Sequence, residues 1–273
     1  MDKLDLLSRR LREFGKVAVA YSGGVDSTFL LKVAKDVLGD RVVAVTAVST
    51  VDPDEEIQSA RKMAKTIGAR HIVVESDQMA DEKFLSNPAQ RCYHCKTHVF
   101  GKLAAIAKEL GDFVVIDGSN ADDLKDYRPG MKANLELGIR SPLQEAGFTK
   151  TEIRTLSKKL GLPTWNQPAL ACLASRIPYG TWITPEVLRR IDASETAIRK
   201  LGFEQVRVRH HGKIARIELP AGELSDFIKS CTENGIVEKL KSIGYVYITL
   251  DMEGYRTGSM NEVLRNRSTR IRK

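Results

Sequence analysis

The chain has 273 residues, a net charge of +8 and a hydrophobic content of 42%. These values are typical of a soluble globular protein with one large or two modest domains, and without a long apolar run a membrane-spanning chain is excluded. The N-terminal segment alternates charged residues with leucines and has no secretory apolar core, so we expect a cytoplasmic protein with reduced cysteines.

Residues 1–180 are expected to form an α/β domain. Its strand-like runs are rich in β-branched residues and lie about a helix apart, at residues 17–20, 42–45, 71–74 and 113–116. Such runs predict a parallel sheet covered by helices on both faces. Ligands bind these sheets at the carboxyl ends of the strands, so we expect a site where residues 22–27, 46–49 and 117–123 meet.

Residues 181–273 are expected to form a smaller α+β domain that binds substrate or joins subunits. Four prolines between residues 163 and 185 mark the connection to it. The predicted elements are a helix over 185–201, strands over 204–210 and 213–219, helices within 221–241 and a strand over 244–250. The basic segment Arg265–Lys273 could contact nucleic acid, or it forms a solvated terminus.

Residues 22–27 read Ser-Gly-Gly-Val-Asp-Ser and lie between a predicted strand and a predicted helix. A loop that enters a helix in this way presents backbone N–H groups and the positive end of the helix dipole to an anion. Gly23 and Gly24 allow the backbone to approach phosphate oxygens that a Cβ would block. The segment lacks the lysine of a Walker loop and instead resembles the PP-loop of the N-type ATP pyrophosphatases.

The resemblance to PP-loop enzymes implies cleavage of ATP into AMP and pyrophosphate. The residues expected at ATP lie on the predicted rim of the sheet: Ser22, Gly23, Gly24, Asp26, Ser27, Thr46, Ser49, Gly118 and Asn120. Asp26 is expected to bind Mg²⁺, directly or through water, rather than to act as a base. The alternative for the loop is a plain glycine turn between a strand and a helix.

Cys92 and Cys95 have the Cys-x-x-Cys spacing, and Cys172 lies in the distant proline-rich stretch. Three thiolates on a 4Fe–4S cluster leave one iron open for sulfide or substrate. The alternatives are a zinc site completed by a nearby histidine, a redox pair, and buried thiols without a ligand. Cys231 belongs to no motif, and a structural thiol is expected there.

Several segments together resemble the LarE family, the ATP-dependent sulfur transferases of nickel-pincer nucleotide cofactor synthesis. They are residues 22–27, 91–96, 117–120, 140–143, 172–176 and 251–261. The resemblance implies that the carboxylates of pyridinium biscarboxylic acid mononucleotide become thiocarboxylates through an acyl-adenylate. Some members of the family sacrifice the sulfur of the residue that matches Cys172, whereas members with three cysteines bind a 4Fe–4S cluster. The matches at Cys92, Cys95 and Cys172 imply the cluster-binding kind, and sacrificial transfer from Cys172 is the alternative.

Two groups of charged side chains are predicted near the substrate. Arg207 and Arg209 share one face of a predicted strand and suit a 5′-phosphate, unless that face is merely solvated. Arg176 is expected to neutralise phosphate or carboxylate charge beside Cys172, with a structural ion pair as the alternative.

Three further side chains are predicted at the substrate. Asp226 is expected to bind a ribose hydroxyl, and Asp123 closes the rim after the predicted ATP residues. Tyr93, between two of the cysteines, is expected to stack on the pyridinium ring, with packing as the alternative.

Other function classes remain alternatives. A PP-loop tRNA thiolase with a cluster would be favoured by a larger basic face and by RNA affinity in modest salt. A second alternative is an ammonia-using ligase such as NAD synthetase, which needs no cysteine cluster. A third is a non-enzymatic nucleotide-binding module, which would release no AMP. The expected partners are the small mononucleotide and further copies of the chain in a homo-oligomer, without a membrane or nucleic acid. The sequence leaves the oligomeric state, the sulfur donor and the role of the cluster open.

Overall fold

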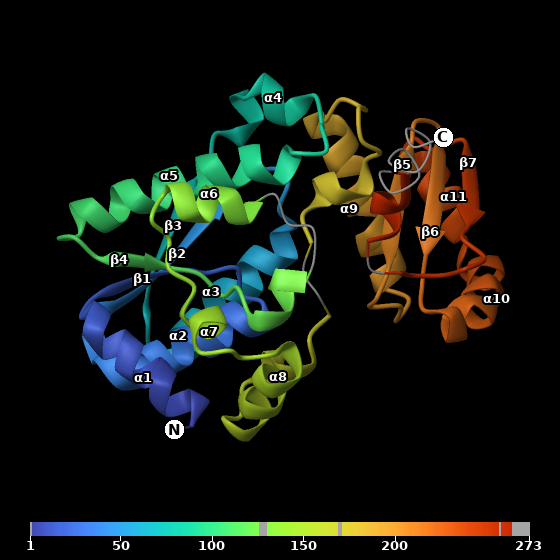
Figure 1. The fold of residues 1–273 in the computed structure, drawn as a ribbon. Helices are drawn as coiled ribbons and strands as arrows, with labels where there is room; N and C mark the ends of the chain where they lie inside the picture. Colours follow the sequence, from blue (N-terminus) through green and yellow to red (C-terminus); the bar gives the residue numbers. More distant parts are fainter. Residues whose placement is uncertain (1, 126–129, 169–170, 257, 264–273) are drawn as a thin grey trace, which may run out of the picture. The chain divides into compact units, whose positions relative to one another are not determined.

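The computed structural model describes residues 2–125, 130–168, 171–256 and 258–263, which form two compact units (Figure 1). The first unit contains the described residues up to Phe84 and from Gln90 to Pro168, and the second contains Leu85–Ala89 and those from Ala171 onward. The basic segment Arg265–Lys273 lies outside the described residues. None of the described helices is long and apolar enough to cross a membrane.

A parallel sheet of four strands forms the centre of the first unit, as the β-branched runs predict. Its strands are β1 (Val17–Ala20), β2 (Val42–Val48), β3 (Arg70–Glu75) and β4 (Val114–Ile116), in the order β3-β2-β1-β4. Val17 pairs with Val42 on one side and with Val114 on the other. Because the strand order reverses beside β1, the loops after β1 and β4 both open at the topological switch point, where such sheets bind ligands.

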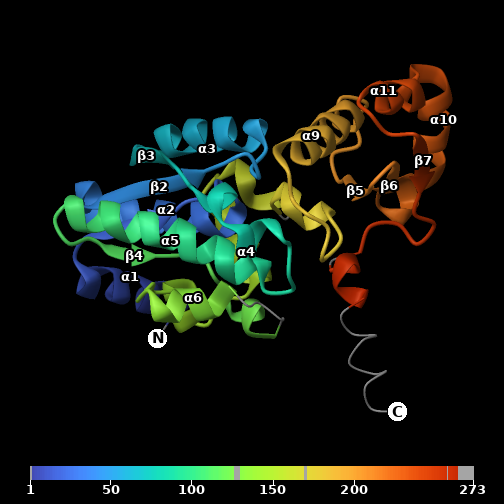
Figure 2. The ribbon, with the colours of Figure 1, turned by 90° about the horizontal axis from the view of Figure 1, so that it is seen from above.

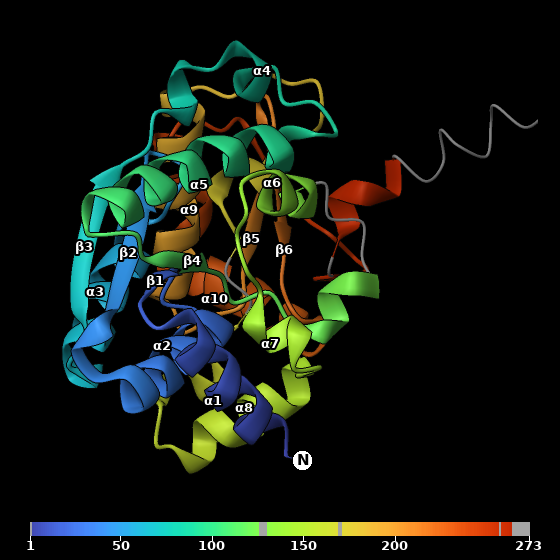
Figure 3. The same cartoon turned by 60° about the vertical axis from the view of Figure 1, so that its left-hand side comes forward.

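Helices cover both faces of this sheet (Figures 1 and 3). The helices α1 (Lys3–Phe14), α2 (Val25–Leu38) and α3 (Asp54–Ile67) share one core with Val17 and Val19. On the opposite face, α5 (Arg91–Glu109) packs against Ala18. Successive side chains of β1 therefore enter two different cores, which is why the strand reads as a continuous apolar run.

Shorter elements complete the first unit. They are η1 (Gly39–Arg41), η2 (Gln78–Ala80), α4 (Glu82–Leu85, whose last residue belongs to the second unit), η3 (Ala121–Lys125), α6 (Gly130–Glu136), α7 (Pro142–Glu145), α8 (Lys150–Lys159) and η4 (Pro163–Asn166). Thr149 and Glu152 form a capping box that begins α8. Contacts between α8 and α2 bring the start of α8 to the Ser22–Ser27 loop.

The second unit is built on a small mixed sheet. Its strands β5 (Arg207–His211), β6 (Ile214–Glu218) and β7 (Tyr247–Leu250) lie in the order β5-β6-β7, the first pair antiparallel and the second parallel. The helices α9 (Pro185–Arg199), α10 (Leu224–Asn234) and α11 (Ile236–Ser242) lie on one side of it (Figure 2). They share a core with Val208, whereas its neighbours Arg207 and Arg209 belong to the other face. The 3₁₀ turns η5 (Leu173–Arg176), η6 (Ala221–Glu223) and η7 (Ser259–Asn261) connect these elements.

Candidate functional site

The Ser22–Ser27 loop folds around the hydroxyl groups of its two serines. Ser22 Oγ lies 3.1 Å from Ser27 Oγ, and the Gly24 N–H donates to Ser22 Oγ at 3.3 Å. The Ser27 hydroxyl donates to the Gly24 carbonyl at 3.3 Å. Gly24 precedes α2, and no side chain of the described residues caps this helix. The first N–H groups of α2 are therefore available to an anion, as the motif predicts.

Gly23 and Gly118 have no room for a side chain. Gly23 has a φ of +77°, and a Cβ there would lie 2.8 Å from Ala60 Cβ in α3. Gly118 follows β4, and a Cβ on it would lie 2.9 Å from the Ser27 amide nitrogen. The loop after β4 thus packs directly on the first turn of α2, which requires glycine.

Asp26, in the first turn of α2, forms an ion pair with Lys150, the first residue of α8. Lys150 Nζ lies 2.5 Å from Asp26 Oδ2. Asp26 Oδ1 is buried and has no hydrogen-bond partner among the described residues. Burial raises the pKa of Asp26, and the Lys150 ammonium opposes this shift. Asp26 therefore keeps an open acceptor beside the loop, and a carboxylate oxygen in this position fits Mg²⁺.

Lys150 is not among the residues that the motifs predict, although the sequence carries a signal for it. The pattern Thr149-x-x-Glu152 marks the start of a helix and places Lys150 in its first turn. A lysine there lies at the positive end of the helix dipole, where a cation is unfavourable without an anion nearby. Such a lysine therefore indicates an acidic partner or an anionic ligand.

Asp117, directly after β4, is buried and organises the loop that carries Gly118. Ser141 Oγ donates to its Oδ1 at 2.6 Å, and Ser119 Oγ and Asn134 Nδ2 both donate to its Oδ2 at 2.7 Å. These bonds satisfy both carboxylate oxygens. Asp117 therefore holds the loop after β4 in place, a role that its position in the Asp-Gly-Ser-Asn motif does not reveal.

Asn120 and Asp123 close a tight turn on the same rim. The Asn120 N–H donates to Asp123 Oδ2 at 2.9 Å, and Asn120 Oδ1 accepts from the Asp122 N–H at 2.9 Å. Both side chains are buried. ATP binding by Asn120 and substrate binding by Asp123 stay predictions.

Thr46 and Ser49 lie at the carboxyl end of β2, and their hydroxyls bind neighbouring protein groups. The Thr46 hydroxyl donates to the Tyr21 carbonyl at 2.6 Å and lies 2.8 Å from His71 Nε2. Ser49 Oγ accepts from Gln78 Nε2 at 2.8 Å. Both residues are at the expected edge of the sheet, and their contact with ATP stays a prediction.

Cys92 and Cys95 lie in the first turns of α5, which begins at Arg91. Residues three apart in a helix share a face, so both thiols can bind one metal centre. Cys92 is exposed and Cys95 is half-buried. This pair of thiols fits an iron–sulfur cluster, whose usual protein ligands are thiolates.

Tyr93 extends from the same helix turn to α6. Its hydroxyl donates to Glu136 Oε2 at 2.7 Å, and Lys132 Nζ lies 5.6 Å from the centroid of its ring. The ring therefore already carries one cation–π contact. Stacking of Tyr93 on a pyridinium ring stays a prediction.

Cys172 belongs to the second unit and precedes η5. Its carbonyl accepts from the Ser175 N–H at 2.9 Å and from Arg176 Nη1 at 3.0 Å. Within the described residues, no group of three or more His, Cys, Asp and Glu side chains is placed to hold a metal ion. The backbone around Cys172 is thus fixed by the turn that follows it.

Arg176 and Glu195 form a buried ion pair next to Cys172. Arg176 Nε and Nη2 each lie 2.9 Å from a Glu195 carboxylate oxygen, and the two side chains are 1% and 0% exposed. Burial alone would raise the pKa of Glu195, but Arg176, Arg207 and the Val208 N–H together hold this pKa below its usual value. Arg176 Nη1 also donates to the Ala171 carbonyl. These contacts support the structural alternative for Arg176, which anchors the chain at Cys172.

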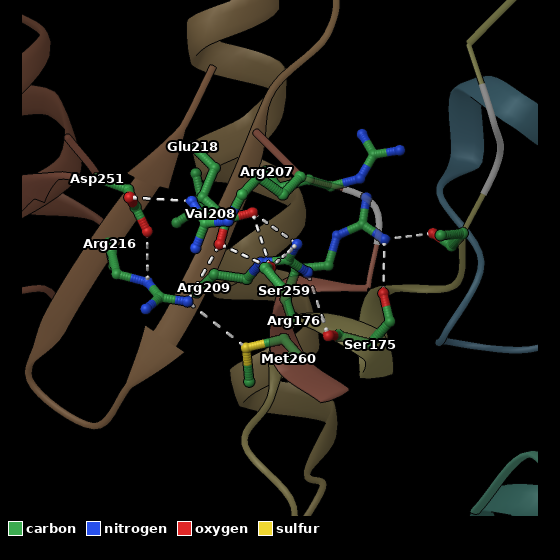
Figure 4. Close-up of polar contacts among 12 residues, drawn as sticks. Ser175, Arg176, Arg207, Val208, Arg209, Arg216, Glu218, Asp251, Ser259 and Met260 are labelled. Atoms are coloured by element: carbon green, nitrogen blue, oxygen red, sulfur yellow. Dashed lines mark hydrogen bonds and ion pairs between the residues drawn. The ribbon is translucent and has the colours of Figure 1, made fainter. Parts of the chain in front are cut away.

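Arg209 and Glu218 form a second buried pair across β5 and β6 (Figure 4). Arg209 Nη2 lies 2.6 Å from Glu218 Oε2 and 3.0 Å from Ser259 Oγ, which in turn donates to Glu218 Oε1 at 3.0 Å. Arg207 lies on the same face, and its Cζ is 5.6 Å from the centroid of the Tyr255 ring. Burial and the charge of Arg176 both lower the pKa of Arg207. The two arginines share a face as expected, but that face is buried rather than solvated.

The remaining residues considered from the sequence lie on α10. Asp226 has an exposed side chain 3.8 Å from Lys229 Nζ, and its contact with a ribose stays a prediction. Cys231 packs partly buried against the core of the second unit, and burial raises its pKa. These contacts fit the structural thiol expected there.

Comparisons with known proteins find similar sequences that align with nearly the whole chain. A family model described as the arginosuccinate synthase N-terminal HUP domain matches residues 16–122. The chain is 46% identical to an uncharacterized protein of Synechocystis sp., over 96% of this chain and 98% of that one. It is 43% identical to the pyridinium-3,5-bisthiocarboxylic acid mononucleotide synthase of Lactiplantibacillus plantarum, over 93% and 92%. An uncharacterized protein of Methanocaldococcus jannaschii is 29% identical, over 94% and 98%.

Proposed function

Because the chain belongs to the family of the pyridinium-3,5-bisthiocarboxylic acid mononucleotide synthases, the LarE family, we propose that it inserts sulfur into a carboxylated mononucleotide at the expense of ATP. The substrate is pyridinium biscarboxylic acid mononucleotide, and each reacted carboxylate becomes a thiocarboxylate. The observation that carries the proposal is the Ser22–Ser27 loop, which offers N–H groups to phosphate beside the open Oδ1 of Asp26.

ATP activates the carboxylate, which is a poor electrophile with a poor leaving group. A carboxylate oxygen attacks the α-phosphorus, the bond to the β-phosphate breaks, and an acyl-adenylate and pyrophosphate form. The N–H groups of the Ser22–Ser27 loop stabilise the charge that grows on the departing pyrophosphate. Asp26 would hold Mg²⁺, which neutralises phosphate charge when bound. Thr46, Ser49, Gly118 and Asn120 complete the ATP site.

Sulfide then adds to the acyl carbon, the bond from that carbon to the AMP oxygen breaks, and AMP leaves. Cys92, Cys95 and Cys172 would hold a 4Fe–4S cluster, which supplies the sulfide when bound. Arg176 supports this step from its buried pair with Glu195 by holding the backbone of Cys172. Direct transfer of the Cys172 sulfur is the alternative route.

The second unit would bind the phosphate of the mononucleotide. Arg207 and Arg209 alternate with Val208 along β5, so their side chains share one sheet face, and charge-assisted hydrogen bonds from guanidinium groups suit a phosphate. Asp226, Tyr93 and Asp123 would contact the rest of the substrate. We also propose an ATP domain over residues 1–180, a substrate and oligomerisation domain over 181–273, and a homo-oligomer.

The products test the ATP chemistry. The protein is incubated with Mg·ATP and the biscarboxylate nucleotide, and AMP with pyrophosphate is expected. Asp26→Ala should lower the rate on the order of a hundredfold, because the site loses its metal ligand. Asp36→Ala, at an exposed position of the same helix, is the control. ADP and phosphate as main products would contradict the proposal.

The cysteines test the sulfur route. Anaerobically purified protein should contain iron and sulfide, and Ala at Cys92, Cys95 or Cys172 should reduce both, whereas Cys231→Ala should not. Added sulfide should support several products per chain, and the mass of the protein should be unchanged after turnover. A loss of hydrogen sulfide at Cys172 would instead establish the sacrificial route.

A further inference from the structure

We propose that Lys150 is an exchangeable cation of the ATP site. It neutralises Asp26 while the site holds no nucleotide, yields that carboxylate to Mg²⁺ when nucleotide arrives, and then donates to phosphate oxygens. The inference rests on the proposed ATP chemistry and adds to it a phosphate-binding residue and an order of binding.

The contacts of Lys150 allow its side chain to move while its backbone stays fixed. Lys150 Nζ lies 2.5 Å from Asp26 Oδ2, and the two side chains are 34% and 23% exposed. The Lys150 N–H donates to Asp122 Oδ2 at 2.9 Å, within the capped first turn of α8. The ammonium can therefore leave Asp26 by rotation of its own side chain, without any shift of α8 or of the core.

The charges favour exchange over a permanent ion pair. Lys150 binds one oxygen of Asp26, and the other, Oδ1, is buried without a hydrogen-bond partner among the described residues. A buried acceptor without a partner is costly. A divalent ion carries more charge than an ammonium and can satisfy a carboxylate that faces incoming phosphates. Metal and ammonium thus compete for Asp26.

The phosphates offer the displaced ammonium a second partner. Asp26 lies in the first turn of α2 and Lys150 in the first turn of α8, so both lie at positive ends of helix dipoles. Such a place disfavours an unpaired lysine and favours an anion. Once Mg²⁺ holds Asp26, the phosphate oxygens are new anions beside the loop, and they receive Lys150.

A permanent ion pair between Lys150 and Asp26 predicts different affinities from an exchangeable one. Two binding measurements distinguish the two hypotheses. Mn²⁺ is titrated into the full chain without nucleotide and followed by electron paramagnetic resonance. The affinity for α,β-methylene ATP is measured separately by calorimetry in the presence of Mg²⁺. The variants are K150M, K150R and the control K159M, which removes an exposed lysine from the other end of α8.

K150M should bind Mn²⁺ about tenfold more tightly and the ATP analogue about tenfold more weakly, because one change removes a competitor and a phosphate ligand. K150R should keep weak Mn²⁺ binding and recover part of the analogue affinity, and K159M should change neither. Unchanged or jointly weakened affinities in K150M would overturn the proposal in favour of a structural ion pair. If K150M does not fold, K150Q carries the same test.

These measurements need no turnover, so they are independent of the sulfur chemistry. Failure of the chain to make a thiocarboxylate would leave the Mn²⁺ result interpretable. Conversely, an unchanged Mn²⁺ affinity in K150M would reject the exchange of Lys150 while leaving the release of AMP and pyrophosphate untouched.

Discussion

Gly118 packs so closely on Ser27 that a Cβ on Gly118 would lie 2.9 Å from the Ser27 amide nitrogen and 3.1 Å from its Cα. The atoms it would meet are backbone atoms of the first turn of α2, which cannot rotate away as the end of a side chain can. The loop that follows β4 and the loop that follows β1 are therefore fitted to each other at the switch point of the sheet.

Gly118→Ala should push the Ser22–Ser27 loop out of place. We expect ATP binding to weaken about tenfold or more and unfolding free energy to fall by about 1–3 kcal/mol, as overpacking usually costs. Calorimetry with α,β-methylene ATP and thermal denaturation measure the two effects. Gly101→Ala, in α5 with no atom within 4 Å of the added Cβ, is the matched control. Equal ATP affinities in the two variants would contradict the fit between the loops.

Arg207→Ala should weaken binding of the mononucleotide and leave ATP binding nearly unchanged. A charge-assisted hydrogen bond to phosphate is worth about 1.5–3 kcal/mol, and the KM for the mononucleotide should rise accordingly. Arg189→Ala, at an exposed position on α9, serves as the control. Equal losses for both ligands would indicate damaged folding in place of a lost phosphate contact.

Glu195→Gln should leave the Arg176 guanidinium buried without its counter-charge. Breaking a buried pair in this way costs about 3–5 kcal/mol of unfolding free energy, which denaturant titration measures. Glu186→Gln breaks an exposed pair with Arg190 on the same helix and should cost less than about 1 kcal/mol. If both variants lose the same stability, the Arg176 pair does not anchor the second unit.

Asp52 should make stability fall as pH rises through its pKa. Burial raises the pKa of Asp52 to about 6, although its Oδ2 accepts from the Ser49 N–H at 2.9 Å. The folded chain therefore binds this proton more tightly than the unfolded chain. The stabilisation is complete below the unfolded pKa of about 4 and is lost as pH rises through about 6, a change of about 3 kcal/mol.

Asp52→Asn should remove this dependence. Compared with the original chain, the variant should gain stability at neutral pH relative to acidic pH, as denaturant titrations at both values would show. Asp36→Asn, which breaks an exposed pair with Lys32, should change the unfolding free energy by less than about 1 kcal/mol at either pH. An equal change in the free energy of unfolding at both pH values in Asp52→Asn would contradict the raised pKa.

The sequence predicts the fold class well because buried parallel strands read as β-branched runs. The order β3-β2-β1-β4 is not readable, since it depends on packing between segments far apart in the chain. The start of α5 at Arg91 is not readable from the sequence either. Cysteine, histidine and tyrosine have weak helix preferences, so the Cys92–Cys95 motif resembles a loop by composition.

The candidate site likewise contains local features that the sequence predicts and long-range contacts that it does not. The Ser22–Ser27 loop is local, and its strand–loop–helix context predicts its geometry. The pair of Asp26 and Lys150 joins residues 124 positions apart, so no local pattern reveals it. Arg176 shows the limit most clearly, because its neighbours in sequence do not reveal that its partner is the buried Glu195.

The fate of the carboxylate oxygen tests the central claim most directly. The biscarboxylate nucleotide is labelled in its carboxylates with heavy oxygen, and the phosphates formed during sulfur insertion are examined by mass spectrometry. Activation as an acyl-adenylate moves one labelled oxygen into AMP for each thiocarboxylate made, and leaves pyrophosphate unlabelled. Label in inorganic phosphate together with ADP, or thiocarboxylate formed with unlabelled AMP, would contradict the account.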